Sequence, residues 1–313
     1  MTRAFIFPGQ GSQAVGMGKE LAAVFPAARQ VFDEVDESLK QNLRRLMFEG
    51  PQEDLMLTEN AQPAMMAASM AVMAVIKKEG GVEPRQICRF VAGHSLGEYT
   101  ALTAAGALSL SDAAGLLKTR GRAMQDAVPV GEGAMAALIG LGLDEARAVA
   151  LDAAQGDVCE VANDNTPGQV VLSGGRAAIE RALEIASERG ARRCVLLPVS
   201  APFHCALMAP AAEAVAEALD GITISDPMVT LIANVTAGPV EDVAEIHRLL
   251  VEQVTAMVRW RESVLYMLDK GVDSLIEVGA GKVLTGLVRR INSDLTGIAV
   301  TAPDEIEAFL KTL

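Results

Sequence analysis

The sequence predicts an α/β protein in which a mostly parallel sheet is flanked by helices and a ferredoxin-like (βαββαβ) subdomain is inserted. Along most of the 313 residues, short apolar runs rich in Val, Ile and Phe alternate with longer helical patterns. Such alternation is typical of a parallel sheet covered by helices. Between residues 129 and 199 the expected order is strand, helix, strand, strand, helix, strand, the split βαβ arrangement. We therefore expect a large subdomain formed by residues 1–128 and 200–313, with an insert over residues 129–199.

In the first part of the chain, each apolar run is followed by helical patterns. The first run ends in Pro8-Gly9-Gln10-Gly11, and the second leads at once into a helix. Ser109 or Ser111 is suited to cap a later helix, because a serine hydroxyl accepts a hydrogen bond from a free N–H of the first turn. The predicted strands are 4–7 and 90–93, and the predicted helices are 17–25, 27–47 with a break near 37–41, 60–78, 96–106 and 111–127.

The insert and the remainder of the chain follow in the same way. Stretches that contain Gly or Pro border the insert at residues 129–133 and 200–202, as expected for loops. Within the insert we predict strands at 134–140, 158–162, 169–173 and 194–199 and helices at 144–154 and 177–189. Beyond it we predict strands at 229–235, 274–278 and 297–301 and helices at 243–257, 260–270, 282–292 and 304–313.

The composition argues against several classes of protein. A net charge of −13 at pH 7 disfavours nucleic-acid binding, which needs positive charge. The longest apolar run, residues 64–76, is too short to cross a bilayer and is expected to form a buried helix. No basic region precedes a cleavable apolar stretch, so no signal peptide is expected. We expect no nucleic-acid partner, no membrane partner and a cytoplasmic location.

The cysteines point away from metal and redox chemistry. None of Cys88, Cys159, Cys194 and Cys205 forms a CxxC pair, so zinc and dithiol sites are not indicated. Scattered single cysteines are typical of a reducing cytoplasm, where they behave as small apolar residues. We predict neither a metal site nor a bound cofactor.

The sequence Gly93-His94-Ser95-Leu96-Gly97 fits the G-x-S-x-G nucleophile elbow. In this motif the serine lies at a tight turn from a strand to a helix, and the glycines permit strained backbone and close approach of the neighbouring chain. The helix N-terminus directs free N–H groups toward the reacting centre. The pattern alone is common, but here an apolar strand precedes it and a helical pattern follows it. Ser95 is therefore a candidate nucleophile.

A serine hydroxyl needs a base to take its proton, and the chain has three histidines. His247 lies in a charged helical stretch and is expected at the surface. His94 adjoins Ser95, but neighbours on an elbow point in different directions, so we expect His94 to support the turn. His204 lies in a loop after the last strand of the insert, a suitable place for a base. A purely structural histidine is the alternative interpretation.

The glycine-rich turn Pro8-Gly9-Gln10-Gly11 follows the first predicted strand. It is not a dinucleotide-binding fingerprint, because the third glycine is missing at the required spacing, and the chain also lacks a P-loop. The remaining interpretation is an oxyanion hole, in which a backbone N–H of this turn joins the N–H of the residue after the nucleophile.

Together these features resemble the malonyl-CoA:acyl carrier protein transacylase family, over nearly the whole chain. That family has a hydrolase-like α/β fold with a ferredoxin-like insert, in agreement with the predicted pattern. The set of motifs is far more specific than any single member. The matching stretches, in the order of the family, are Phe7-Pro8-Gly9-Gln10-Gly11-Ser12-Gln13, Gly93-His94-Ser95-Leu96-Gly97-Glu98-Tyr99, Arg120-Gly121-Arg122-Ala123-Met124-Gln125, Asn165-Thr166-Pro167-Gly168-Gln169, Ala201-Pro202-Phe203-His204, Asn234-Val235 and Glu277-Val278-Gly279.

The resemblance implies a role at each matching position of the catalytic machinery. Ser95 would be acylated, and His204 would act as its base. The N–H groups of Gln10 and Leu96 would hold the oxyanion. The backbone carbonyl of Gln253 would orient His204, in place of the acid of a full triad.

The resemblance also implies substrate-binding residues. Arg120 would bind the malonyl carboxylate through its two-pronged guanidinium, although taken alone it would be an ordinary helix-surface arginine. Phe203 resembles the malonyl-type pattern of related polyketide acyltransferases, because a bulky ring leaves less space for an α-methyl branch. One methyl group is worth only about 1–3 kcal/mol of discrimination in an apolar pocket. Asn163 would contact the substrate.

By the same resemblance, the chain would transfer a malonyl group from malonyl-CoA to acyl carrier protein through a malonyl-serine, in fatty acid or polyketide synthesis. Coenzyme A would be part of the substrate, and a monomer is the working expectation. An acidic carrier protein would need local positive charge, and the alternative is that these arginines are ordinary surface residues. The candidates are Arg189, Arg192, Arg193, Arg289 and Arg290.

Three alternatives stay open at this point. A serine hydrolase would share the elbow but would place an acid between the serine and the histidine in the chain, and Asp164 is available there. A non-enzymatic scaffold could bind a carrier protein without chemistry. An acyltransferase could use a different acyl donor.

Overall fold

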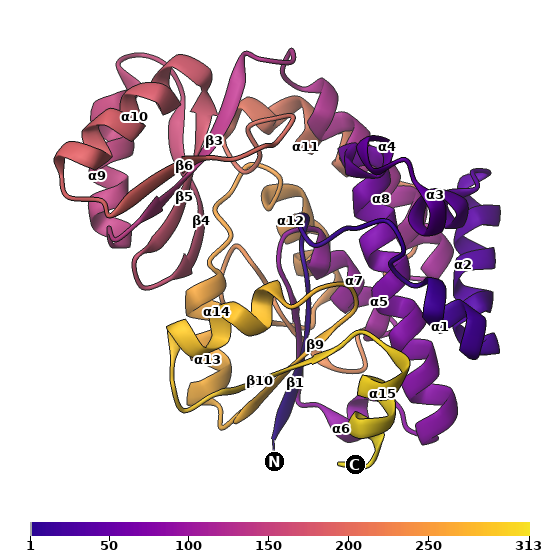
Figure 1. Ribbon diagram of the computed structural model, residues 1–313. Coiled ribbons are helices and arrows are strands. Elements are labelled where there is room, and N and C mark those ends of the chain that lie inside the picture. Colours follow the sequence, from indigo (N-terminus) through magenta and orange to yellow (C-terminus); the bar gives the residue numbers. More distant parts are fainter. Residues whose placement is uncertain (1) are drawn as a thin grey trace.

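In the computed structural model, which describes residues 2–313, six strands form the larger sheet in the order β10-β9-β1-β2-β7-β8. Figure 1 shows β10, β9 and β1 side by side. Neighbours from β10 to β7 are parallel, and β8 pairs antiparallel with β7 at one edge. Phe7 is in register with Gly93, so the turns that follow β1 and β2 lie side by side. The strands are β1 (Arg3–Phe7), β2 (Phe90–Gly93), β7 (Thr230–Ile232), β8 (Pro239–Val240), β9 (Ser274–Val278) and β10 (Thr296–Val300).

Helices cover both faces of this sheet, which is why most residues of its central strands β1, β2 and β9 are apolar and buried. Along β1, Phe5 and Phe7 pack into one core and Ala4 and Ile6 into another. The first core is closed by α2 (Pro26–Leu39), α5 (Thr58–Gly80), α7 (Leu96–Ala104), α8 (Leu110–Asp126) and α15 (Pro303–Leu310), and the second by α13 (Trp260–Asp269) and α14 (Val283–Ile291). The mixed α/β class predicted from the sequence is confirmed.

Helix α5 contains the long apolar run, and almost all of its residues are buried from Thr58 to Ile76. The helix forms part of the first core rather than a surface layer. None of the helices within residues 2–313 combines the length and apolar character needed to cross a membrane.

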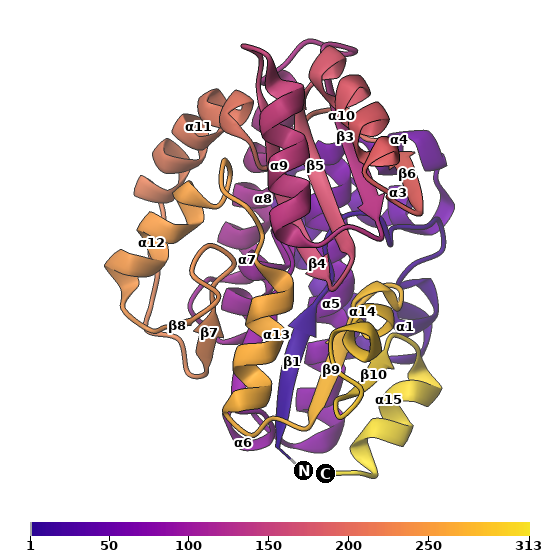
Figure 2. The same cartoon turned by 90° about the vertical axis from the view of Figure 1, so that its left-hand side faces the viewer.

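A second sheet of four antiparallel strands has the order β4-β5-β3-β6. With α9 and α10 between the strands, this is the ferredoxin-like unit that was predicted. Both helices pack on one face (Figure 2), in a small core of their own. The other face turns toward the main body, and its Met135, Ala137 and Val171 join the first core. The elements are β3 (Gly133–Ile139), α9 (Leu143–Ala154), β4 (Cys159–Thr166), β5 (Gln169–Gly175), α10 (Arg176–Glu188) and β6 (Arg193–Leu196).

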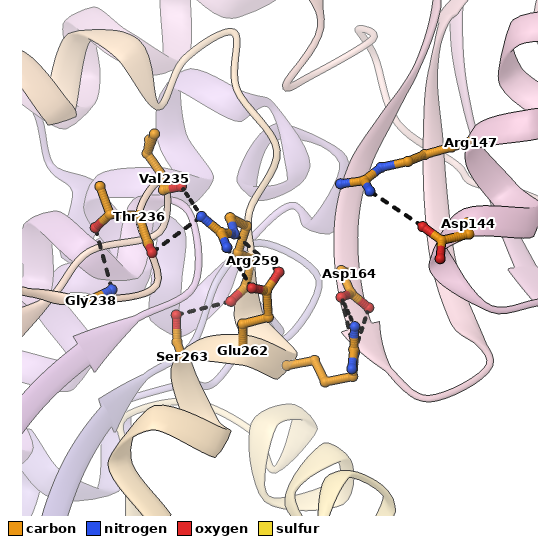
Figure 3. A network of polar contacts seen from close by, with 10 residues as sticks. Asp144, Arg147, Asp164, Val235, Thr236, Gly238, Arg259, Glu262 and Ser263 are labelled. Atoms are coloured by element: carbon orange, nitrogen blue, oxygen red, sulfur yellow. Dashed lines mark hydrogen bonds and ion pairs between the residues drawn. The ribbon is translucent and has the colours of Figure 1, made fainter. Parts of the chain in front are cut away.

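Strand β4 fastens this sheet to the loop before α13. Asn163 and Val258 form a parallel bridge, in which Val258 N–H donates to the Ala162 carbonyl (2.9 Å) and Asp164 N–H donates to the Val258 carbonyl (3.0 Å). The buried Asp164 carboxylate pairs with the Arg261 guanidinium at 2.8 Å (Figure 3). The two sheets are therefore joined through specific polar contacts at this point.

Some predicted elements differ from the structure. Helix α11 (Ala209–Asp220) was not predicted, because its apolar residues are mostly alanines and give weak periodicity. The short α4 (Gln52–Met56), α6 (Pro84–Ile87) and β8 were also missed. The helix predicted at 243–257 is α12 (Val243–Glu252), and the strand predicted at 194–199 ends at Leu196. The predicted break near 37–41 separates α2 from α3 (Leu43–Glu49), and α1 spans Lys19–Val24.

Candidate active site

Ser95 lies on a strained turn between β2 and α7. Its backbone has φ 54° and ψ −111°, a region that L-residues rarely adopt and that is common at functional sites. The flanking glycines make the turn possible. A Cβ on Gly93 would lie 1.9 Å from the Gly97 carbonyl carbon, and a Cβ on Gly97 would lie 2.2 Å from the Phe7 carbonyl oxygen. Each contact is too short for any side chain, so the G-x-S-x-G pattern is required by packing.

His204 is in hydrogen-bond contact with Ser95. Its Nε2 lies 2.7 Å from Ser95 Oγ, and its Nδ1 lies 2.9 Å from the backbone carbonyl oxygen of Gln253. A carbonyl can only accept, so Nδ1 carries the proton and Nε2 is free to accept the hydroxyl proton of Ser95. The Gln253 carbonyl is available because Gln253 is the C-cap of α12, where carbonyls lose their intrahelical partners.

Arg120 is buried on α8, with only 1% of its surface exposed. Its Nη1 donates to Gln62 Oε1 (2.8 Å), and its Nη2 donates to Gln253 Oε1 (2.9 Å) and to Ser95 Oγ (3.1 Å). The guanidinium also lies over the ring of Tyr99, 5.3 Å from the centroid. A buried cation is therefore held in contact with the hydroxyl of Ser95.

The other predicted site residues surround the same cavity, whose volume is about 560 Å³. Leu96 is the first residue of α7, so its N–H has no intrahelical partner. Gln10 lies in the turn after β1, which is held against the elbow by the hydrogen bond from His94 N–H to the Phe7 carbonyl (3.0 Å). Among the residues that line the cavity are Gln10, Ser95, Leu96, Arg120, Asn163, Phe203 and His204.

Sequence analysis assigned no role to the polar residues behind the dyad, which are Gln62, Glu98, Tyr99 and Asn234. Asn234 Oδ1 accepts from Ser95 N–H (2.8 Å), and its Nδ2 donates to the Gly93 carbonyl (2.6 Å). Glu98 Oε2 accepts from Asn234 N–H (3.0 Å) and from Gln253 Nε2 (2.8 Å). Two signals were available. Glu98 is a glutamate inside the otherwise uncharged helical pattern that follows the elbow, and Glu98, Tyr99 and Asn234 all belong to the matching motifs.

Burial and charge set the protonation states in this cluster. Burial first, and then the positive charge of Arg120, lowers the pKa of His204 to about 3, so that His204 is neutral at pH 7. Burial raises the pKa of Glu98 to about 7 in spite of its hydrogen bonds. Burial also raises the pKa of Tyr99 to about 12, so its hydroxyl stays protonated. The cluster thus presents a neutral base beside a cation.

The other two histidines have structural partners. His94 Nε2 is 2.9 Å from Asn165 Oδ1, and its ring lies 5.7 Å from that of Trp260. Burial lowers the pKa of His94, which disfavours its charged form. His247 is half-buried on α12 and lies 3.4 Å from Asp220. The expectation that neither acts on Ser95 agrees with these contacts.

Within residues 2–313, no group of three or more His, Cys, Asp and Glu side chains is arranged to hold a metal ion. The cysteines of this part of the chain are free thiols, and burial raises the pKa of the Cys205 thiol, which follows His204, to about 11. A protonated thiol is a poor nucleophile, so Ser95 is the better candidate for acylation.

Comparison with known proteins agrees with this geometry. The model of the acyl transferase domain family matches residues 4–302. The chain is 48% identical over 311 residues to a malonyl CoA-acyl carrier protein transacylase of Bacillus subtilis, covering 99% of this chain and 96% of that protein. This chain belongs to the malonyl-CoA:acyl carrier protein transacylase family. The Escherichia coli K12 transacylase is 44% identical over 308 residues, with 98% of each chain covered.

Solved structures of the transacylase family have the same fold. The acyl-carrier-protein S-malonyltransferase of Bartonella henselae is 54% identical, with a TM-score of 0.97 over 100% of this chain and 99% of that one. A malonyl transacylase solved in complex with a type II polyketide synthase acyl carrier protein is 40% identical, with a TM-score of 0.96 and full coverage of both chains. The predicted hydrolase-like fold with its ferredoxin-like insert is therefore confirmed for this member.

The pKa of His204 leads to a prediction about pH. Because this pKa lies below the ordinary value near 6.5, the neutral form persists as the pH falls from 7 toward 5. We expect the rate of Ser95 modification by a sulfonyl fluoride, followed by intact mass spectrometry, to show no loss with a midpoint near 6.5. In Arg120→Gln, the removed positive charge should shift the acid limb to higher pH. A wild-type midpoint near 6.5 would contradict this account.

Proposed function

We propose that this chain transfers a malonyl group from malonyl-CoA to the phosphopantetheine thiol of acyl carrier protein, by a ping-pong reaction through a malonyl-serine. The observation that carries this proposal is the double contact of Ser95 Oγ, with the neutral base His204 on one side and the cation of Arg120 on the other. A hydrolase needs only the first contact, whereas a carboxylated acyl group needs both. The names of its full-length relatives agree.

In the first half-reaction, Ser95 Oγ attacks the thioester carbonyl carbon while His204 Nε2 takes the hydroxyl proton. The carbonyl oxygen becomes an oxyanion, which the N–H groups of Gln10 and Leu96 stabilise. The carbon–sulfur bond then breaks, and His204 returns its proton to the sulfur of coenzyme A. The product is a malonyl ester of Ser95.

The second half-reaction reverses these steps with a new thiol. His204 Nε2 takes the proton of the phosphopantetheine thiol, the thiolate attacks the ester carbonyl, and the proton returns to Ser95 Oγ as the ester breaks. No step calls for a metal or a further cofactor, since coenzyme A arrives as part of the substrate. The carbonyl of Gln253 keeps the imidazole in the tautomer that both halves need.

Arg120 is proposed to bind the malonyl carboxylate. Its Nη2 is 3.1 Å from Ser95 Oγ, so a carboxylate one methylene beyond the ester carbonyl would lie within reach. Its Nε is buried and has no hydrogen-bond partner among residues 2–313, which leaves a donor for an incoming anion. In a buried site the ion pair with a carboxylate is far stronger than in water. Phe203, 9% exposed on the cavity wall, would disfavour an α-methyl branch, and Asn163 would contact the substrate.

The serine hydrolase alternative is weakened by the position of Asp164, the acid considered for it. The Asp164 carboxylate pairs with Arg261 at the junction of the two sheets, while the Nδ1 of His204 faces a peptide carbonyl. A hydrolase would also need a positioned water. Whether malonyl-CoA is hydrolysed or its malonyl group is transferred separates the two activities.

The carrier protein is proposed to dock beside the insert. Arg192 and Arg193 follow α10, are exposed, and form no ion pair with described residues. Arg189 instead pairs with Asp152, and Arg290 donates to Gln169. Uncompensated arginines attract an acidic partner more strongly than paired ones. Arg289 is exposed on the last turn of α14 and is a second candidate.

We also infer two subdomains, one formed by residues 1–128 and 200–313 and the other by residues 129–199. The separate core of α9, α10 and one face of the small sheet supports this division. A cytoplasmic monomer remains our expectation. The free cysteines suit a reducing compartment.

Ser95→Ala should abolish formation of the covalent intermediate, because the attacking oxygen is gone. Intact mass spectrometry after exposure to malonyl-CoA should show one added malonyl group on the wild-type chain and none on the variant. A retained adduct on Ser95→Ala would refute the assigned nucleophile.

Arg120→Ala should weaken acylation by malonyl-CoA far more than acylation by acetyl-CoA, which lacks the carboxylate. We expect a loss of about 2–4 kcal/mol in transition-state binding for malonyl-CoA, the usual cost of removing one partner of a desolvated charge pair. Steady-state kcat/KM for the two donors measures it. Equal losses for the two donors would argue against binding of the malonyl carboxylate by Arg120.

Charge reversal in Arg192→Glu/Arg193→Glu should slow transfer to carrier protein and spare the first half-reaction. Pre-formed malonyl-enzyme mixed with carrier protein in a rapid-quench experiment isolates the second half. The variant Arg289→Glu tests the second candidate position in the same way. Equal loss in both half-reactions would show that Arg192 and Arg193 do not form the docking site.

A further inference from the structure

We propose that Glu98 is a positioning residue for the selection of carboxylated acyl groups, because it holds Arg120 in place through the side-chain amide of Gln253. This inference rests on the proposed function of the site. In this proposal the side-chain amide of Gln253 positions Arg120, while its backbone carbonyl orients His204.

The amide of Gln253 lies between the carboxyl group of Glu98 and the guanidinium of Arg120. Its Oε1 accepts from Arg120 Nη2 (2.9 Å), and its Nε2 donates to Glu98 Oε2 (2.8 Å). A guanidinium can only donate and a carboxylate can only accept, so these two neighbours allow a single orientation of the amide. Nε2 also donates to the Ser95 carbonyl (3.0 Å) and to Asn234 Oδ1 (3.3 Å), so Glu98 provides the shortest of three contacts that hold this end of the amide. Without Glu98, the amide would be held less firmly with its Oε1 toward Arg120.

A second contact of Glu98 supports the elbow itself. Glu98 Oε2 accepts from Asn234 N–H at 3.0 Å, and the Asn234 side chain holds both the N–H of Ser95 and the carbonyl of Gly93. Gln253 Nε2 also donates to the Ser95 carbonyl at 3.0 Å. Glu98 thus contacts both the group that positions Ser95, which is Asn234, and the group that positions Arg120, which is Gln253.

The burial of the Glu98 carboxyl group indicates that it has a function in the site. Glu98 is 1% exposed and Gln253 is fully buried. An ionised carboxylate in such a place is destabilising unless it is well hydrogen-bonded. Glu98 itself does not line the cavity, so it acts on the substrate only through its neighbours.

The test compares Gln253→Met and Glu98→Met with the wild type, by the rates of Ser95 acylation with malonyl-CoA and acetyl-CoA. Gln253→Met keeps the backbone carbonyl that orients His204 and removes only the amide. In both variants we expect the malonyl-to-acetyl ratio of kcat/KM to fall about tenfold or more, the effect of losing one hydrogen bond to a charged group. Glu98→Gln should recover part of the ratio, because its amide oxygen can replace Oε2.

A double variant shows whether Glu98 acts through Gln253. If it does, adding Glu98→Met to Gln253→Met should lower the ratio no further, since coupled residues are not additive. If Glu98→Met does not fold, the same comparison is made with Glu98→Ala, which also removes the acceptor. Additive effects in a folded double variant, or an unchanged ratio in folded single variants, would overturn the inference.

Glu277→Gln is the matched control. Glu277 is another fully buried glutamate, and it accepts from the N–H groups of Leu284 (3.0 Å) and Thr285 (2.6 Å) at the start of α14, away from the cavity. We expect a lower Tm and an unchanged ratio, and an equal fall in its ratio would also overturn the inference. A wild-type enzyme that forms no malonyl-serine would instead refute the proposed function.

Discussion

The hydrogen bond between His204 Nδ1 and the Gln253 carbonyl is the contact on which the site depends. It fixes the imidazole so that Nε2 faces Ser95, and it does so without a carboxylate. A carboxylate in that position would place a negative charge next to the substrate's own. A peptide carbonyl supplies direction with only a dipole, which leaves the positive field of Arg120 available to an anion. The end of α12 thus shapes both the base and the specificity.

The charged groups behind the cavity are also arranged so that a positive charge faces the substrate. Among residues 2–313, Arg120 is the only cation in contact with Ser95. The groups that contact its guanidinium are the neutral amides of Gln62 and Gln253 and the ring of Tyr99. The carboxyl group of Glu98 lies beyond Gln253, one side chain farther from the reacting atoms. Burial raises its pKa to about 7, which reduces its negative charge at neutral pH, and the Gln253 amide separates it from the guanidinium.

The sequence was most informative where structure follows from neighbours in the chain. The elbow around Ser95 and the βαββαβ order of the insert are local patterns, and both were predicted. The resemblance of the motifs supplied Arg120, which by periodicity alone would have been assigned to the surface. What escaped prediction depends on contacts between distant segments: Glu98 meets Gln253 across 155 residues and Asn234 across 136. The alanine-rich α11 was missed because alanine gives little hydrophobic contrast.

The bridge between Asn163 and Val258 affects how the insert could be exchanged between relatives. Val258 lies five residues after Gln253, and Asp164 is fastened to Arg261 on the same segment. A foreign insert joined at residues 129 and 199 would meet Val258 and Arg261 with a strand that does not match them. Chimeras designed to change carrier-protein preference should therefore replace residues 254–261 together with the insert, as one unit.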